Sequence, residues 1–318
     1  MATFNAFRWE HLPGLIAVWN SVFAGGPNFT PLVEQDFLAR VADQPSFDPE
    51  RLLVACDAGG IVGFVHFGPV TNFWYSLSER TINPSEGQIW ALVAPPSDRD
   101  LVKALLHAAV ERLASDGARK ILFHPSWVQC TQPFYNGIAG AYEMPGLSDT
   151  RAELLDVLAD HGFTPAAHYA TPEFDLSDRA RLSSLMEAAE RIWQRVESAG
   201  ATRAVRQVRS AFFPPRRVVE VIWGLETIAM TAFGPWEEYA RAHGRRLYGI
   251  TGVQVARGWR GMGLGKLIVI LALDAAAEEG ADAVHLHVYK GNERAWNLYH
   301  RALGFQPKHL WLTLERRL

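Results

Sequence analysis

Hydrophobic and polar positions repeat along this 318-residue chain in a pattern of strands and helices that occurs twice. Residues 59–70 and 225–236 alternate apolar with polar positions and end in or near Phe-Gly-Pro, which predicts a strand in each. Residues 87–124 and 249–287 each read as a strand, a turn, a helix and a second strand, and such units place their two strands parallel. The pattern predicts an α/β fold (an α+β mixed sheet).

A third matched pair of segments is helical. Residues 150–163 align without a gap to residues 292–305, and each segment ends in Gly-Phe before a final strand. Because the three pairs occur in the same order, the chain reads as an internal duplication. The boundary is expected near Ser177, which gives a first domain over residues 1–177 and a second over residues 178–318.

The first copy carries an extra segment, residues 125–149, that the second copy lacks. This segment is rich in aromatic residues and glycine. A loop of this length inside a compact domain is usually functional or packs over a neighbouring part. We expect it to cover the interface between the two halves.

The composition bounds the class of protein and its partners. With 48% hydrophobic residues, 20% charged residues and a formal net charge of −3, it is typical of a soluble globular protein without affinity for nucleic acid or an anionic membrane. Only Cys56 and Cys130 are present, no signal peptide pattern is recognised, and Asp274 ends the longest apolar stretch well short of a membrane span. These features predict a cytoplasmic location.

The stretch Arg257–Lys266 holds four glycines directly before an apolar helix. Glycine loses more conformational freedom on folding than any other residue, so this density indicates a backbone that approaches a ligand closely. A helix start offers free N–H groups and a partial positive charge, to which Arg260 and Lys266 add cationic side chains. We expect the loop to hold phosphate groups.

Two familiar phosphate loops are excluded by spacing. Arg260 and Leu267 stand where the mononucleotide P-loop needs Gly and Ser or Thr, and Lys266 stands where the dinucleotide fingerprint needs its third glycine. The loop instead reads Arg-x-x-Gly-x-Gly, which resembles the acetyl-CoA loop of the GNAT superfamily of N-acyltransferases. The resemblance extends over residues 249–307 and includes, in the family's order, the strand 285–288, Asn292, Ala295, Leu298 with Tyr299, and Gly304 with Phe305.

The resemblance implies an acetyl-CoA site and a role for each matched residue. Loop amides would hold the CoA diphosphate, backbone groups of residues 253–255 and Asn292 would hold the pantetheine arm, and Tyr299 would be the general acid. Gly304 follows Tyr299 by five residues, where four is the commoner family spacing. The binding residues implied are Val253, Gln254, Val255, Arg260, Gly261, Met262, Gly263, Leu264, Gly265, Lys266, Asn292 and Ala295.

The matched loop of the first copy, residues 95–105, has lost these features. It contains no glycine, two prolines that lack an N–H group, and two aspartates whose charge would repel a diphosphate. Thr150 stands in place of Asn292, and Val157 stands in place of Tyr299. We expect this copy to bind no cofactor and to act as a structural partner or a wall of the substrate site.

The general base is open among several groups. His287 shares a strand face with His285 and is a candidate proton acceptor, although the matching His124 in the first copy suggests a structural position. Glu220 and Glu226 are further candidates, and deprotonation through water is another alternative.

Plain structural roles are also open for several residues. Tyr299 lies on an apolar helical face and fits a core position, and Asn292 is a good helix N-cap. Arg203, Arg206 and Arg209 recur every three residues, which would place them on one helical face that we interpret as solvated.

The sequence therefore predicts two tandem GNAT-like acyltransferase domains, the first degenerate. The second is expected to move an acetyl group from acetyl-CoA to a primary amine of a small molecule or peptide, by direct attack in a ternary complex. A non-catalytic CoA-binding sensor and a structural protein are the alternatives. We expect a monomer or homodimer and assign no metal.

Overall fold

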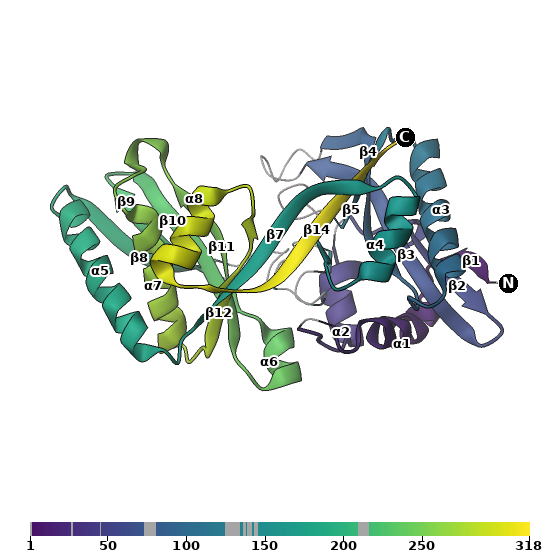
Figure 1. Ribbon diagram of the computed structural model, residues 1–318, viewed down its shortest axis with the longest axis horizontal. Coiled ribbons are helices and arrows are strands. Elements are labelled where there is room, and N and C mark those ends of the chain that lie inside the picture. The colour runs from purple at the N-terminus through teal and green to yellow at the C-terminus, as the bar shows by residue number, and fades with distance from the viewer. Residues whose placement is uncertain are drawn as a thin grey trace. The chain divides into compact units, whose positions relative to one another are not determined.

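The computed structural model describes residues 2–26, 28–44, 46–72, 81–124, 134, 135, 138, 142, 146–208 and 216–318. It divides into two compact units, unit 1 with residues 1–169 and 310–318 and unit 2 with residues 170–309 (Figure 1). The chain passes from one unit to the other inside two strands, β7 (Thr164–Asp175) and β14 (Gln306–Arg317). The domain boundary expected near Ser177 stays a prediction.

Unit 1 is a twisted sheet with helices against it. The final strand of its sheet is the last part of β14, which pairs antiparallel with β5 from Leu314 to Arg317. Its strands in order are β1 (Thr3–Ala6), β2 (Leu52–Asp57), β3 (Gly60–Asn72), β4 (Thr81–Val93), β5 (Lys120–Phe123) and β14, with the short β6 (Leu147–Ser148) also on β14. Its helices are α1 (Leu12–Phe23), α2 (Glu34–Phe37), α3 (Arg99–Ser115) and α4 (Ala152–Asp160).

Unit 2 repeats this arrangement. Here the final strand is the last part of β7, which pairs antiparallel with β12 from Glu173 to Asp175. The strands in order are β8 (Ala201–Val208), β9 (Arg216–Trp223), β10 (Glu226–Pro235), β11 (Leu247–Val255), β12 (Ala283–Leu286) and β7, with the short β13 (Val288–Tyr289) also on β7. The helices are α5 (Arg179–Glu197), α6 (Glu237–His243), α7 (Leu264–Glu278) and α8 (Glu293–Trp296), and a π-helical turn covers Asn297–Leu303.

The two sheets have the same pattern of strand directions. All neighbouring strands with a described register are antiparallel except β4 with β5 and β11 with β12, which are the strand pairs joined by a long helix. In each unit the last strand of the sheet belongs by sequence to the other copy. The predicted α/β class with mixed sheets and the internal duplication are therefore confirmed.

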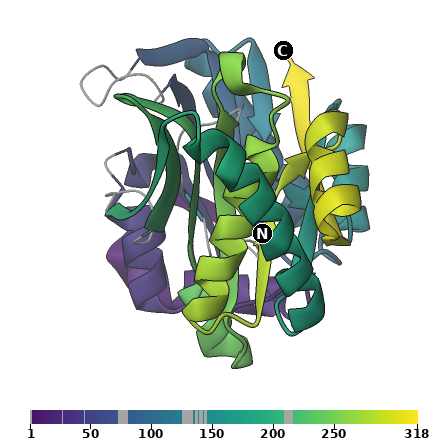
Figure 2. The same ribbon diagram turned by 90° about the vertical axis from the view of Figure 1, so that its left-hand side faces the viewer.

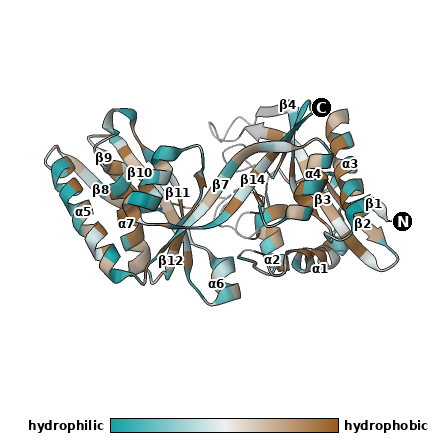
Figure 3. Ribbon diagram, viewed as in Figure 1, coloured by the Kyte–Doolittle hydropathy of each residue, from teal (hydrophilic) through white to brown (hydrophobic). Residues whose placement is uncertain are grey.

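The core of unit 2 is built around α7. This helix packs across β9, β10 and β11 and lies beside α5 (Figure 2), and its ribbon is largely apolar (Figure 3). Complete burial of one Leu or Ile side chain stabilises a fold by about 1.5–3 kcal/mol, so this packing fixes where the helix begins. The buried residues of α7 are Leu264, Leu267, Ile268, Val269, Ile270, Ala272, Leu273 and Ala276.

The expected arginine face is wrong, and the segment 125–149 lies mostly outside the described residues. Arg203 and Arg206 lie in strand β8, where a spacing of three places them on opposite faces, so they share no helical face. Arg209 is not among the described residues. Neither is most of the segment 125–149, but its Tyr135 stacks on Trp19 in the unit 1 core at 5.2 Å between ring centroids.

The structure also bears on membrane spans and on the two cysteines. Within the described ranges, no helix is both long and apolar enough to cross a membrane. Cys56 on β2 is a free thiol, and Cys130 lies outside the described residues. The cytoplasmic location remains a prediction.

Candidate functional site

The candidate site lies where β11 and β12 of unit 2 part. Their parallel register runs only from Leu247 opposite Ala283 to Ile250 opposite Leu286, at the end of β12. Among the described strands, the remaining part of β11, Thr251–Val255, pairs with β10 and with no other. Its other edge is therefore available to a ligand that adds to it like a strand.

A β-bulge stands at the point where the two strands part. Met230 of β10 pairs with Gln254 and Ala232 pairs with Thr251, so Thr231 faces two residues of β11, Gly252 and Val253. Gly252 has a φ of +64°, which explains why glycine occupies this position. A bulge leaves the extra residue unpaired and bends the strand, and this one bends β11 next to the gap.

The glycine loop follows directly from this strand. Gly261 and Gly263 have φ angles of +89° and +88°, and Gly263 is the N-cap of α7. The first N–H groups bonded within the helix are those of Lys266 and Leu267, which donate to the Gly263 carbonyl at 2.9 and 3.0 Å. The N–H groups of the two preceding residues have no intrahelical acceptor and point along the positive end of the helix dipole. The loop thus has the form of an anion site.

Together these elements line a pocket of ≈ 790 Å³. It contains twelve of the fourteen residues singled out from the sequence, and the two that do not line it are Met262 and His287. Met262 is 44% exposed on the loop. The residues brought together are Val253, Gln254, Val255, Arg260, Gly261, Gly263, Leu264, Gly265, Lys266, Asn292, Ala295 and Tyr299.

The pocket also has lining residues that sequence reasoning missed. Four lie on β10, which faces the pocket because Ile228 accepts a hydrogen bond from the Ala256 N–H at 2.9 Å and holds the start of the loop against that strand. Tertiary pairing decides which strands lie side by side. The lining residues of β10 could therefore have been found only from a prediction that β10 pairs with β11. The added residues are Thr227, Ile228, Ala229, Met230, Ala256, Trp259 and Arg294, and Leu298, which belongs to the matched family pattern, lines the pocket as well.

The charged side chains among the described lining residues are all positive. Arg260, Lys266 and Arg294 line the pocket, and no Asp or Glu is among the lining residues that the structure describes. Arg260 donates from Nε to the Val255 carbonyl at 3.1 Å, which ties its side chain to the end of β11. The pocket suits a ligand with several negative charges.

Asn292 is a helix N-cap and also a residue of the pocket lining. Its side-chain oxygen accepts from the Ala295 N–H at 3.1 Å and caps α8, while the residue lines the pocket. Because the oxygen serves as the cap, the amide nitrogen is the group left to donate to a ligand.

Tyr299 is a buried residue of the pocket lining. It is 7% exposed, packs edge-on to Phe305 at 6.0 Å between ring centroids, and belongs to the unit 2 core as well. Burial raises the pKa of the Tyr299 phenol well above its usual range. The phenol is therefore neutral at physiological pH and carries a proton that it can donate.

The unusual spacing between Tyr299 and Gly304 is taken up by the π-helical turn. The N–H groups of Gly304 and Phe305 both donate to the Tyr299 carbonyl, and Gly304 ends the turn with a φ of +84°. The aligned segment of unit 1, residues 150–163, has the same length, but its helix α4 is α-helical. The longer spacing is common to both copies, whereas the π turn is present in unit 2 and not in α4.

None of the three side chains considered as the general base, His287, Glu220 and Glu226, lines this pocket. His287 is partly buried with Nδ1 2.7 Å from the Thr171 hydroxyl, and burial of its ring lowers its pKa to about 3, too low for a proton acceptor at neutral pH. His285 is buried 5.3 Å from His287. Glu220 is paired with Arg206 at 2.6 Å, and Glu226 lies exposed at the start of β10. Proton removal through water remains open.

In unit 1 the matched place is closed. A cavity of only ≈ 10 Å³ is left there, lined among others by Val157, the counterpart of Tyr299, and by Arg151. The Arg151 guanidinium lies over the ring of Phe23 at 4.9 Å, and burial lowers its pKa. At the start of α3, Asp98 accepts from the Leu101 N–H at 3.0 Å, so a carboxylate occupies the helix terminus. This space holds at most about one water molecule.

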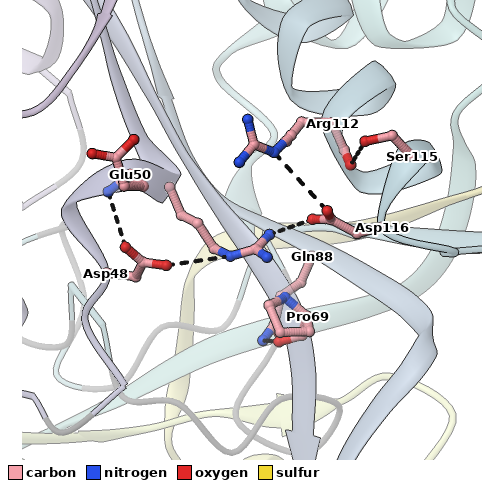
Figure 4. Close-up of polar contacts among 8 residues, drawn as sticks. Asp48, Glu50, Pro69, Gln88, Arg112, Ser115 and Asp116 are labelled. Atoms are coloured by element: carbon pink, nitrogen blue, oxygen red, sulfur yellow. Dashed lines mark hydrogen bonds and ion pairs between the residues drawn. The ribbon is translucent and has the colours of Figure 1, made fainter.

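Elsewhere in unit 1 polar side chains hold elements together. Arg51 donates to Asp116 at the end of α3 at 2.6 Å and lies 3.6 Å from Asp48 (Figure 4). In the same close-up, the Gln88 amide donates to the Pro69 carbonyl at 2.9 Å between β4 and β3. These contacts bridge neighbouring elements of the fold.

The family comparison agrees with this geometry. The acetyltransferase (GNAT) family model matches residues 182–305. These residues form a GNAT domain. The match begins in α5 and ends at Phe305, so it contains the glycine loop, the parting strands and the π turn of the GNAT domain.

Solved structures show that the whole chain has a tandem GNAT fold. A glucosamine N-acetyltransferase region of a fungal multi-domain β-N-acetylglucosaminidase has 18% identity and a TM-score of 0.65, and the match covers 99% of this chain and 38% of that one. The chain thus spans well under half the length of that protein. A tandem GNAT protein from the clavulanic acid biosynthesis pathway has 14% identity and a TM-score of 0.64, with coverage of 100% and 98%. A GCN5-related N-acetyltransferase from Sphaerobacter thermophilus has 13% identity and a TM-score of 0.58, with coverage of 99% and 95%.

No curated protein sequence matches the chain. At the identities found for the solved structures, the similarity concerns the fold. The tandem arrangement predicted from the duplication is confirmed by it.

Proposed function

We propose that the GNAT domain transfers the acetyl group of acetyl-CoA to a primary amine. The observation that carries the proposal is the single pocket of ≈ 790 Å³ that joins a helix-start anion site, the free edge of β11 and a buried tyrosine. CoA has a matching sequence of groups: a diphosphate, an amide-bearing arm and a terminal thiol. The three cations and the absence of carboxylates among the described lining residues support a polyanionic ligand.

Each part of the pocket has a task in this proposal. The N–H groups of Leu264 and Gly265, with Lys266, would hold the diphosphate, and the backbone of residues 253–255 with the Asn292 amide would hold the pantetheine arm. Acetyl-CoA supplies an acyl group activated as a thioester. Positioning alone is worth up to about 7–11 kcal/mol of the activation barrier when both reactants are held in line.

Tyr299 would manage the proton of the leaving group. As the acceptor nitrogen forms its bond to the acyl carbon and the carbon–sulfur bond breaks, the phenol donates a proton to the departing sulfur. The proton lost by the amine passes through water and restores the phenol. No cysteine or serine is among the described lining residues, which supports direct attack by the amine over a covalent acyl-enzyme.

The acceptor is proposed as a primary amine of a small molecule or peptide in the cytoplasm. Because one structurally similar region is described as a glucosamine N-acetyltransferase, an amino sugar belongs in the test panel beside diamines and a peptide with a free N-terminus.

The experiment is a titration with acetyl-CoA followed by measurement of thiol release over this panel. The proposal expects saturable binding and amine-dependent release by the wild-type protein, and release lowered in Tyr299→Phe, which removes only the hydroxyl. Binding without release on any amine would leave a CoA sensor. Absence of binding would leave a structural protein.

A further inference from the structure

One tryptophan that lines the unit 2 pocket, and a second tryptophan in contact with it, have no task in the transfer reaction. Trp259 lines the pocket just before Arg260, and its ring centroid lies 5.7 Å from that of Trp223. Trp223 is 45% exposed, although it is among the largest apolar side chains. This tryptophan pair, Trp223 and Trp259, forms an aromatic surface that begins inside the pocket and continues to solvent.

Both rings are held in place by their surroundings. The Trp223 indole donates to the Ala199 carbonyl at 2.8 Å. The Trp259 side chain packs against the unit 2 core, and its backbone N–H donates to the Ala256 carbonyl at 2.9 Å within the short turn before the glycine loop. An aromatic surface fixed before binding loses little entropy when a flat ligand stacks on it.

The position of the tryptophan pair determines which part of the ligand it contacts. Tyr299 is a buried residue of the pocket lining, and the glycine loop is the anion site. In CoA, the pantetheine arm and the nucleoside leave the diphosphate on opposite sides. With the thiol at Tyr299 and the diphosphate at the loop, the nucleoside lies beyond the diphosphate. The aromatic side chains among the described lining residues are Tyr299 and Trp259, and Trp259 directly precedes Arg260 of the loop.

We propose that the tryptophan pair is the base-stacking surface of the site and binds the adenine of CoA, with Trp259 in direct contact and Trp223 supporting it. This proposal rests on the proposed function, since it identifies the nucleotide end of the same ligand. Stacking of a base on an aromatic side chain is worth about 5- to 150-fold in affinity when the side chain is removed.

The test compares dissociation constants for CoA, 4′-phosphopantetheine and pantetheine. The first ligand has the adenine, the second keeps a phosphate without it, and the third has neither. We expect Trp259→Ala to weaken CoA about tenfold or more and to leave 4′-phosphopantetheine within about twofold of wild type. Trp259→Phe, which keeps an aromatic face, should recover most of the loss. Trp9→Ala, which removes a 59% exposed tryptophan of unit 1, is the matched control and should change none of the three constants.

Three outcomes would overturn the proposal, and they differ. Equal losses of CoA and 4′-phosphopantetheine affinity in Trp259→Ala would mean that the ring only supports the anion site. An unchanged CoA constant in Trp259→Ala, with a weaker one in Arg294→Gln, would mean that the nucleotide leaves over α8. If wild-type protein binds neither CoA nor 4′-phosphopantetheine, the proposed function itself fails.

Discussion

Replacing single glycines of the loop by alanine tests whether backbone geometry makes the anion site. Gly263 has a φ of +88°, and a Cβ there would lie 3.2 Å from Cδ1 of Ile192. Gly261 has a φ of +89° with open space around it, and Gly258 has open space and no positive φ. The three positions separate the cost of the φ angle from the cost of the contact.

The magnitudes follow from these environments. An L-residue in the left-handed region costs about 1–2 kcal/mol, so Gly261→Ala should lose about that much stability. Gly263→Ala adds the contact with Ile192, which brings the loss to about 2–3 kcal/mol. Gly258→Ala is expected to be neutral or to stabilise by about 0.4–1 kcal/mol.

The effect on binding follows from the same strain. If the loop relieves it by turning, an N–H group no longer faces the diphosphate, and a hydrogen bond to a charged group is worth about 1.5–3 kcal/mol. Loss of one such bond weakens CoA binding by roughly 10- to 150-fold.

Calorimetric titration with CoA and urea denaturation of each variant measure both effects. The expected order of affinity is wild type equal to Gly258→Ala, then Gly261→Ala, then Gly263→Ala. If Gly263→Ala binds CoA as wild type does, or if Gly258→Ala loses as much affinity as Gly263→Ala, the reasoning from backbone geometry is refuted.

Four further predictions concern single side chains. Tyr299→Phe should lower kcat by about 10²- to 10⁴-fold with the CoA dissociation constant unchanged, as thiol-release kinetics and calorimetry would show; an unchanged kcat would remove its acid role. Asn292→Asp keeps a good N-cap, so it should lower CoA affinity without lowering Tm, whereas Asn292→Ala should also cost about 1 kcal/mol of stability; equal behaviour of the two would contradict the separate roles. Burial lowers the pKa of His287 to about 3 from an ordinary 6.5, so its contribution to the free energy of unfolding is complete above pH 6.5 and falls by up to about 1.4 kcal/mol per pH unit toward pH 3. His287→Gln should therefore flatten the dependence of the urea midpoint on pH between pH 7 and pH 4. An unchanged slope would contradict this. Arg151→Ala should give unit 1 no CoA site, because the helix start there still carries Asp98, and a second equivalent of bound CoA would disprove that reading.

The loop residues could be predicted from the sequence because their chemistry is local. Gly261 and Gly263 are needed for φ angles that side chains rarely adopt, and such a requirement leaves a mark at its own position. Asn292 was identified for a similar reason, since an N-cap bonds within three residues of itself.

The remaining parts of the site depend on tertiary pairing. Ile228 and Thr227 reach the pocket because β10 pairs with β11, and nothing in their own sequence marks them. His287 alternates with apolar neighbours as an active-site residue would, yet the strand turns it toward Thr171. The prediction that the arginines of β8 share a helical face was wrong. A spacing of three residues is compatible with a helix, but the segment forms a strand.

The exchange of final strands also lay beyond the sequence. Each copy has a last strand in the expected place along the chain, but the part of β7 from Glu173 pairs in unit 2 and the part of β14 from Leu314 pairs in unit 1. The final strand of either copy can pair with the same sheet edge, because both strands have the same hydrophobic alternation.

The central claim is that one anion-binding loop, in unit 2, holds one CoA. Calorimetric titration of the full chain with CoA tests it through the stoichiometry. One molecule of CoA per chain, lost or strongly weakened in Gly263→Ala, is the predicted result. Two molecules per chain, or none, would contradict it.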